Sequence, residues 1–389
     1  MSVDSPLGST LGVVGGGQLG RMLAEAAAPL GVEIIVLDPT PDAPAAPVSR
    51  DQIVAAFDDT AAIDRLAQKA DVLTYEIELA DPDVLEAIAK KTGTPVEPAP
   101  DTLRMIQDKY TQKQALAEAG IPVPAVSSVD TTHALRAACE ELGYPAMLKA
   151  RSGGYDGRGN TPIASPDDLE RAWAEISGPA MVEAFVDFAR EISVIGVKGT
   201  DERRCYVPAE NVHEDEILRE SIVPARIAPA VKEQALRVAH DVLDQVEGRG
   251  VYGIELFETH DGEILVNEIA PRPHNSGHWT IEGAVTSQFE QHVRAVLGLP
   301  LGSTAVRCPI VTKNILGDTG TTQPASPTGI TPLLESNDVH LHWYGKQDVR
   351  PLRKMGHIAV YGEEDQTVDA LLKTARTYAS DITFDTNEV

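Results

Sequence analysis

Residues 252–279 read YGIELFETHDGEILVNEIAPRPHNSGHW, and this stretch carries the clearest structural signal in the chain. Two apolar-rich runs, Tyr252 to Glu258 and Ile264 to Ile269, flank the dipeptide Asp261-Gly262. Asp-Gly between two such runs predicts a β-hairpin closed by a two-residue turn. Counting back from that turn places Glu255 directly opposite Glu268.

The predicted glutamate pair has a chemical consequence. Side chains of opposed strand residues share a face, with Cβ atoms roughly 4.5–5.5 Å apart. Two carboxylates at that spacing repel each other unless a cation lies between them. A hard cation with oxygen ligands, above all Mg²⁺, would turn the repulsion into a binding site. The alternative is a register slipped by one residue, which would leave one glutamate in solvent.

The segment that follows the hairpin predicts a substrate site. It leaves the second strand through Pro271 and Pro273, which stiffen an irregular loop. Four polar side chains lie on this loop beside the predicted metal pair: Arg272, His274, Asn275 and Ser276.

Length and composition limit the class of protein. The chain has 389 residues, enough for two or three domains, and its 42% hydrophobic and 24% charged content is ordinary for a soluble enzyme. Its 33 basic and 59 acidic residues give a net charge of −26. Nucleic acid and anionic membranes repel such a chain, so we expect neither as a partner. An anionic substrate would need a local cationic pocket.

The remaining compositional signals favour a cytoplasmic protein. Cys139, Cys205 and Cys308 are far apart and lack metal-ligand spacing, which is typical of free thiols in a reducing compartment. No apolar run approaches the roughly 20 residues of a membrane span, and the N-terminus lacks a signal-peptide pattern.

A glycine loop lies near the N-terminus. Strand Leu11 to Val14 leads into Gly15-Gly16-Gly17-Gln18-Leu19-Gly20, and a helix to about Ala28 and a strand Val32 to Leu37 follow. This βαβ pattern with G-x-G-x-x-G and Asp38 fits a dinucleotide site, but a mononucleotide or purely structural use remains open. A further strand, Asp71 to Tyr75, ends at Glu76 and Glu78, where open α/β sheets bind ligands.

A second glycine-rich run follows the predicted strand Tyr144 to Ala150, which carries Lys149. Gly153 to Gly159 can close backbone N–H groups on phosphates, although no Gly-Lys-Ser/Thr of a P-loop follows. Before it, the pattern predicts one amphipathic helix from Thr102 to about Ala119, with Lys109 within it.

Tyr344 to His357 form a basic run in this acidic chain, with cations at Lys346, Arg350, Arg353 and Lys354. Such a cluster indicates an anion site. A charged hairpin edge is the alternative.

Taken together, these motifs resemble the ATP-grasp superfamily, and within it the N5-carboxyaminoimidazole ribonucleotide synthase family. The matching segments follow the family's order over nearly the whole chain: Gly15 to Met22, Tyr75-Glu76, Gln107-Asp108-Lys109, Gly153 to Gly159, Glu210 to His213, Asn267 to Trp279 and Tyr344 to His357. The resemblance implies an α/β ATP-grasp architecture with a Rossmann-like N-terminal domain (1–100), an ATP-grasp domain (101–307) and a small, mostly β C-terminal domain (308–389).

The resemblance also implies a set of site residues. Those implied for ATP are Lys109, Lys149, Gly154, Tyr155, Asp156, Gly157, Arg158, Gly159, Asn160, Glu183, Ala184, Phe185, Val186, Glu191, His213, Asn267 and Glu268. Those implied for the second substrate are Gly17, Gln18, Leu19, Glu76, Tyr155, Arg158, Arg272, His274, Asn275, Ser276, Lys346, Arg350, Arg353 and Lys354. Catalytic roles fall to Tyr155, Arg158, Arg272, His274 and Lys346, and the Mg²⁺ (or Mn²⁺) ligands are Glu255 and Glu268. The chain departs from the pattern at Ala270, where many ATP-grasp ligases have asparagine, and at Leu352, where the family commonly has glycine.

The reaction implied by the resemblance joins ATP, bicarbonate and 5-aminoimidazole ribonucleotide to give the N5-carbamate, ADP and phosphate, in a homodimeric enzyme of purine biosynthesis. Other functions remain open. One is a sister ligase using another acid, such as formate with glycinamide ribonucleotide. Others are an NAD-linked oxidoreductase built on the first glycine loop and a nucleotide-binding regulator without turnover.

Overall fold

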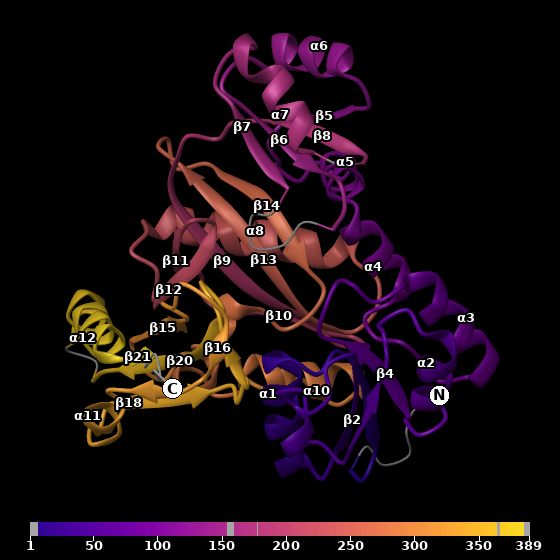
Figure 1. Ribbon diagram of the computed structural model, residues 1–389, viewed down its shortest axis with the longest axis vertical. Coiled ribbons are helices and arrows are strands. Elements are labelled where there is room, and N and C mark those ends of the chain that lie inside the picture. Colours follow the sequence, from indigo (N-terminus) through magenta and orange to yellow (C-terminus); the bar gives the residue numbers. More distant parts are fainter. Residues whose placement is uncertain (1–6, 154–158, 177, 364–365, 385–389) are drawn as a thin grey trace.

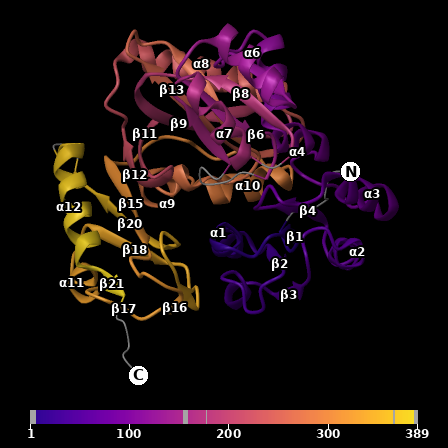
Figure 2. The same ribbon diagram turned by 45° about the horizontal axis from the view of Figure 1, so that its top comes forward.

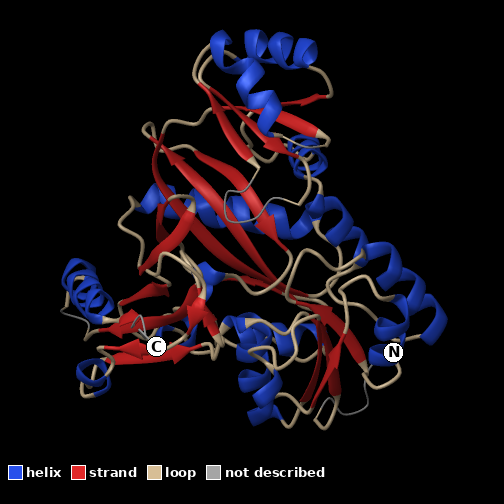
Figure 3. Cartoon of the chain, in the orientation of Figure 1, coloured by secondary structure: helices blue, strands red, loops and turns tan. Residues whose placement is uncertain are grey.

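The computed structural model of this α/β protein describes residues 7–153, 159–176, 178–363 and 366–384, and Figures 1 and 3 show their arrangement. Within these ranges we find no helix that is both long and apolar enough to span a membrane.

The N-terminal part is a parallel four-stranded sheet in the order β3-β2-β1-β4. Its strands are β1 (Thr10–Val14), β2 (Glu33–Asp38), β3 (Asp51–Val54) and β4 (Val72–Tyr75). Its helices are α1 (Gln18–Ala27), α2 (Thr60–Ala67) and α3 (Pro82–Thr92), with short turns η1 (Ala28–Leu30) and η2 (Ala46–Val48). The predicted βαβ unit is thus confirmed, because β1 pairs in parallel with β2 and α1 connects the two strands.

One face of this sheet is covered by a helix from far along the chain. α10 (Gln288–Val296) packs Phe289 and Val293 into the same core as Leu23 of α1 and Val36 of β2. Figures 1 and 2 show α1 and α10 side by side. Ser287 caps this helix by accepting a hydrogen bond from the Glu290 amide.

The single helix predicted from Thr102 to Ala119 is wrong. It is two helices, α4 (Pro100–Gln107) and α5 (Lys109–Glu118), broken at Asp108 with φ −101° and ψ 101°. The Asp108 carboxylate accepts from the amides of Tyr110 and Thr111 and so caps α5. A short acidic side chain that can bond the backbone two and three residues ahead favours such a restart.

A small antiparallel sheet stands apart at the top of Figure 1, in the order β5-β8-β6-β7. Its strands are β5 (Val126–Val129), β6 (Ala146–Ala150), β7 (Asn160–Ile163) and β8 (Ala180–Ala184). Helices α6 (Thr132–Leu142) and α7 (Leu169–Glu175), with η3 (Pro166–Asp168), pack their apolar faces on it. The predicted glycine run 153–159 joins β6 to β7, although residues 154–158 lie outside the described part of the chain.

The largest sheet has nine strands, with β14-β13-β9-β11-β12-β15-β20-β18 in order and β10 on the edge of β9. Their bounds are β9 (Phe188–Lys198), β10 (Arg203–Cys205), β11 (Ala209–Glu214), β12 (Ile217–Val223), β13 (Gly250–Thr259), β14 (Ile264–Ala270), β15 (Ile310–Leu316), β18 (Val339–Trp343) and β20 (Lys354–Tyr361). The sheet is continuous across residue 308, so the expected division into 101–307 and 308–389 stays a prediction.

The remaining helices and strands complete the description of the fold. α8 (Pro229–Gln245) packs on the large sheet through an apolar face that includes Val238 and Val242. The others are η4 (Asn275–Gly277), α9 (Thr280–Gly283), β16 (Gln323–Pro324), β17 (Pro327–Thr328), α11 (Thr331–Leu334), β19 (Asp348–Val349), α12 (Val368–Asp381) and β21 (Thr383–Phe384).

The hairpin β13–β14 has the predicted glutamate pairing but not the predicted turn. The Gly262 amide bonds to the Thr259 carbonyl, and Glu258 pairs with Ile264, so the ladder near the turn is displaced by one residue. A β-bulge at Asn267 then restores the register, and Glu255 faces Glu268. The displaced ladder near the turn and the bulge at Asn267 each shift the pairing by one residue in opposite senses. The pairing at Glu255 and Glu268 is therefore the predicted one, and the slipped register is excluded there.

Candidate active site

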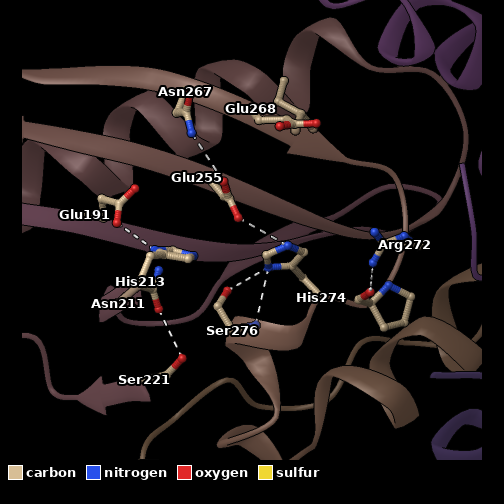
Figure 4. Close-up of polar contacts among 12 residues, drawn as sticks. Glu191, Asn211, His213, Ser221, Glu255, Asn267, Glu268, Arg272, His274 and Ser276 are labelled. Carbon is tan, nitrogen blue, oxygen red and sulfur yellow. Dashed lines mark hydrogen bonds and ion pairs between the residues drawn. The ribbon is translucent and has the colours of Figure 1, made fainter. Parts of the chain in front are cut away.

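The paired glutamates lie at the centre of a polar cluster on the large sheet (Figure 4). Lys109 Nζ at the start of α5 lies 3.0 Å from Glu268 Oε2, and Asn267 Nδ2 lies 3.3 Å from Glu255 Oε2. Burial raises the pKa of Glu255, and the neighbouring Glu268 raises it further. For Glu268, burial acts in the same direction, but Lys109 lowers the pKa below its usual value. Like charges are therefore held together here at an electrostatic cost.

The two carboxylates fit a Mg²⁺ site that phosphate oxygens and water complete, and not a site built from protein ligands alone. Among the residues the structure describes, no group of three or more His, Cys, Asp or Glu side chains is placed to hold a metal ion. Mg²⁺ in nucleotide enzymes is commonly held by one or two carboxylates, with phosphate oxygens and water completing the shell. Glu255 and Glu268 supply two carboxylates on one face, and a divalent cation would relieve their repulsion.

The predicted substrate loop places His274 against the same pair. His274 Nε2 lies 3.4 Å from Glu255 Oε1, and Nδ1 lies 2.8 Å from Ser276 Oγ. Gly253 makes this approach possible, since a Cβ at Gly253 would lie 2.5 Å from His274 Cβ. Burial, followed by the charge of Arg272, holds the pKa of His274 well below its ordinary value, so the imidazole is neutral.

Arg272 leaves the loop on the other side, toward the N-terminal sheet. Its Nε lies 2.7 Å from Glu78 Oε1, and Nη1 donates to the Pro273 carbonyl at 3.0 Å. Glu78 follows β4, and its role as the ion-pair partner of Arg272 was missed from the sequence. The amide atoms of Asn275 are buried, and neither has a hydrogen-bond partner within the described ranges. Such an amide is free to bind a ligand or an ordered water.

The predicted nucleotide residues form two further ion-paired groups. Lys149 Nζ on β6 lies 2.5 Å from Glu183 Oε1 on β8, and His213 Nδ1 on β11 lies 2.6 Å from Glu191 Oε2 on β9. Burial would lower the pKa of His213, but Glu191 raises it above the ordinary value.

The other predicted ATP residues are placed as follows. Ala184 ends β8, and Phe185 and Val186 follow it, with the Phe185 side chain 48% exposed. Asn160 Nδ2, after the glycine run, lies 3.4 Å from Glu216 Oε2. Gly159 is exposed and precedes β7. Gly154, Tyr155, Asp156, Gly157 and Arg158 lie outside the described residues.

The N-terminal glycine loop is filled by the protein's own carboxylates. Glu76 accepts from the Gly17 and Gly20 amides at 2.5 and 2.9 Å, and Asp38 accepts from the Gly16 amide at 2.9 Å. These amides are the donors that a dinucleotide pyrophosphate needs, and the acid at the end of β2 is the one that would bind its ribose. The glycine-loop amides and the Asp38 carboxylate, which together form the dinucleotide fingerprint, are therefore already hydrogen-bonded within the protein. Gln18 and Leu19 begin α1, and the Leu19 side chain is buried in the core.

Glu76 also connects the loop to the two cationic parts of the site. Burial raises the pKa of Glu76 to about 7, although its two amide donors and the charge of Arg272 each lower that pKa. The pKa of Lys346 is lowered to about 7 by burial and by the charges of Arg353 and Lys354, whereas the charge of Glu76 raises it. Arg272, Glu76 and Lys346 therefore share one electrostatic environment.

The basic cluster, defined here as Lys346, Arg350, Arg353 and Lys354, surrounds the β19–β20 turn. Lys346 Nζ donates to the Lys354 carbonyl and Arg353 Nη1 to the Asp348 carbonyl, both at 2.7 Å. Leu352 has φ +61°, the left-handed conformation in which the family's glycine would be unstrained. Leu352 therefore adopts a backbone conformation that favours glycine.

Comparisons with known proteins agree with this arrangement. Residues 9–107 match the ribonucleotide synthetase preATP-grasp domain, residues 114–289 the ATP-grasp domain, and residues 311–371 the phosphoribosylaminoimidazole carboxylase C-terminal domain. The N5-carboxyaminoimidazole ribonucleotide synthase of Brucella melitensis biotype 1 is 45% identical over 355 residues, covering 90% of this chain and 96% of that protein. The enzyme of the same name from Bacillus subtilis is 40% identical over 367 residues, covering 94% of each chain.

A solved structure also matches this chain over nearly its whole length. The N5-carboxyaminoimidazole synthase from Aspergillus clavatus, in complex with ADP and 5-aminoimidazole ribonucleotide, superposes with a TM-score of 0.89. It is 35% identical and covers 96% of this chain and 99% of its own. The chain thus belongs to the N5-carboxyaminoimidazole ribonucleotide synthase family of ATP-grasp ligases.

Proposed function

We propose that this chain uses ATP and bicarbonate to carboxylate 5-aminoimidazole ribonucleotide, giving N5-carboxyaminoimidazole ribonucleotide, ADP and phosphate in purine biosynthesis. One observation carries the proposal: the Glu255–Glu268 pair lies beside His274, which shares the Pro-stiffened loop with Arg272. A phosphate-handling site and a polar substrate loop thus meet at one hairpin. The names of the relatives and the ADP and ribonucleotide of the Aspergillus complex support it.

In the first step, an oxygen of bicarbonate attacks the γ-phosphorus of ATP, the bond to the ADP oxygen breaks, and carboxyphosphate forms. Negative charge spreads over the phosphoryl oxygens, and fixed cations stabilise it. Lys109 and Lys149 are the cations we assign to this task. Mg²⁺, or Mn²⁺ in its place, held by Glu255 and Glu268, would neutralise phosphate charge. Bicarbonate is assigned to the guanidinium of Arg272, which Glu78 orients.

In the second step, carboxyphosphate releases phosphate and carbon dioxide by cleavage of its C–O bond. The exocyclic amine of the ribonucleotide attacks the carbon and must then lose a proton. His274 is neutral and lies beside Glu255, which can stabilise the imidazolium. We therefore assign proton acceptance to His274. Water would hydrolyse carboxyphosphate, so the glycine-rich segment from Gly153, with Tyr155 and Arg158, is assigned the role of closing the site.

The ribonucleotide itself is assigned to the region between the glycine loop and the basic cluster. In a chain of net charge −26, a 5′-phosphate needs local cations, and Lys346, Arg350, Arg353 and Lys354 supply them. Glu76, Gln18 and the free amide of Asn275 are the polar groups assigned to the ribose and base.

ADP release tests the proposal. We expect it to require both bicarbonate and the ribonucleotide, and to fall to background when either is omitted. Formate with glycinamide ribonucleotide should not substitute. ADP release that depends on formate instead of bicarbonate would assign the chain to the sister ligase reaction and overturn the proposal.

Two broader assignments belong to the same proposal. We assign the chain to the cytoplasm, in keeping with its three free cysteines, and to a homodimer. Light scattering coupled to gel filtration should give twice the 41.6 kDa mass of one chain. A monomer at micromolar concentration would contradict the dimer.

A further inference from the structure

α5 carries a buried lysine that the reaction above does not use. Lys113 is 2% exposed, lies one helical turn after Lys109, and faces the interior between the small and large sheets. Its ammonium lies 3.1 Å from Glu183 Oε2 and donates to the Val266 carbonyl on β14 at 2.9 Å. Lys113 therefore contacts one strand of each sheet.

The partner carboxylate is shared. Glu183 is 3% exposed, and its other oxygen, Oε1, lies 2.5 Å from Lys149 Nζ. One buried carboxylate thus holds two ammonium groups, and the group Lys113–Glu183–Lys149 has a net charge of +1. Burial alone would raise the pKa of Glu183, but Lys113 and then Lys149 lower it, so the carboxylate is ionised at neutral pH.

Buried charges are costly unless they are paired, and a lysine interacting with both sheets is not needed to build either one. A single lysine would balance Glu183 completely. Within this group the second ammonium leaves a surplus of one positive charge, which the nearby carboxylate of Glu268 also attracts. Lys113 also limits how strongly Glu183 holds Lys149.

We infer that Lys113 is a positioning residue for the nucleotide: by sharing Glu183 it keeps Lys149 available to the ATP phosphates and fixes the small sheet against the strand that carries Glu268. This inference rests on the proposed use of ATP. It gives α5 two linked tasks, since Lys109 contacts Glu268 while Lys113 contacts Glu183.

The test compares Lys113→Met with a matched control on the same helix. Gln112 is 1% exposed and anchors α5 to β14 without charge, accepting from the Ile269 amide at 3.2 Å. Lys113→Met should raise the KM for ATP, and the Kd for ADP measured by calorimetry, by roughly tenfold or more, because Glu183 would then pair with Lys149 alone and weaken its charge-assisted contact to the phosphates. The KM for the ribonucleotide should stay within about twofold. Gln112→Met should lower the melting temperature without this selective loss.

A charge-restoring double variant separates electrostatics from packing. Lys113→Met leaves the group neutral, Glu183→Gln leaves it at +2, and the two together return it to +1. We expect the double variant to bind ADP more tightly than Lys113→Met alone. If Lys113→Met does not fold, the double variant compared with Glu183→Gln provides the test, because neither of these two variants carries a buried carboxylate at position 183.

Several results would overturn the inference: equal losses for ATP and ribonucleotide, the same ATP loss in Gln112→Met, or additive losses in the double variant. Failure of the proposed function is distinguishable, because ADP binding by calorimetry does not depend on carboxylation. Wild-type protein that binds ADP but shows no bicarbonate-dependent turnover would overturn the function and leave the role of Lys113 standing.

Discussion

At the scale of single residues, Glu268 is the most informative position. It combines the proposed metal-ligand role, in which it faces Glu255, with the ion pair to Lys109. Glu268→Gln should preserve the fold but reduce kcat by roughly a hundred- to thousandfold, because a neutral amide is a poor Mg²⁺ ligand. Steady-state assays at several Mg²⁺ concentrations measure this. Glu263→Gln, on the exposed turn of the same hairpin, is the control. Near-normal turnover at saturating Mg²⁺ would contradict the metal assignment.

Glu76 decides what the first glycine loop can bind. Its carboxylate already accepts from the Gly17 and Gly20 amides, so a pyrophosphate would have to displace a buried anion. We expect calorimetry to detect no binding of NAD or NADP and clear binding of 5-aminoimidazole ribonucleotide. Micromolar affinity for either dinucleotide would revive the oxidoreductase alternative.

At the scale of secondary-structure elements, the break between α4 and α5 controls where Lys109 lies. Asp108 caps α5 and forms an ion pair with Arg151 at the end of β6. Asp108→Ala should reduce the free energy of unfolding by about 1–2 kcal/mol, typical of a lost N-cap, and should raise the KM for ATP. Urea denaturation and steady-state kinetics measure the two effects. Asp101→Ala, on the exposed first turn of α4, should change stability by less than about 0.5 kcal/mol.

The β19–β20 turn concentrates four cations, those of the basic cluster, in a chain of net charge −26. Arginine can present two parallel donors to a phosphate, so Arg353 is the expected main contact for the 5′-phosphate. Arg353→Ala should weaken ribonucleotide affinity by roughly ten- to a hundredfold and leave ATP affinity unchanged, and Arg353→Lys should recover part of the loss. A loss of ATP affinity with normal ribonucleotide binding would move the cluster to the nucleotide half of the site.

At the scale of the whole molecule, buried neutral histidines link stability to pH. Burial lowers the pKa of His292 to about 3 and holds those of His274, His278 and His357 well below 6.5. Below pH 6.5 the unfolded chain therefore binds protons that the folded chain does not. Stability should fall as pH decreases through this range, by up to about 1.4 kcal/mol per pH unit for each histidine.

Two carboxyls and one histidine oppose this trend, since the pKa of His213 is also raised in the folded state. The raised pKa values of Glu76, about 7, and of Glu255 make the folded state bind protons more tightly than the unfolded state. Four histidines outweigh these three groups, so urea denaturation at pH 7.5 and 5.5 should show a net loss of stability on acidification. His292→Leu should reduce the slope, whereas His133→Gln, an exposed residue of α6, should not. Stability that is constant or rises toward pH 5.5 would contradict the prediction.

The sequence alone determined the features that depend on neighbouring residues. Hydrophobic periodicity and turn residues predicted the first βαβ unit and the strand that carries Lys149. The family motifs predicted the α/β ATP-grasp architecture, which the structure and the comparisons confirm. The facing of Glu255 and Glu268 was predicted correctly from an incorrect turn, because the bulge at Asn267 compensates for the displaced ladder.

Only the tertiary structure decided how distant segments meet. Nothing local to α10 indicates that it covers the N-terminal sheet, since an amphipathic helix buries its apolar face against whatever surface the fold provides. The same holds for Lys113 and Glu183, which lie 70 positions apart, as their numbers show, and form an ion pair only when α5 packs between two sheets. A buried charge needs a partner, but the sequence does not say which one, because partner choice depends on contacts formed across the whole chain.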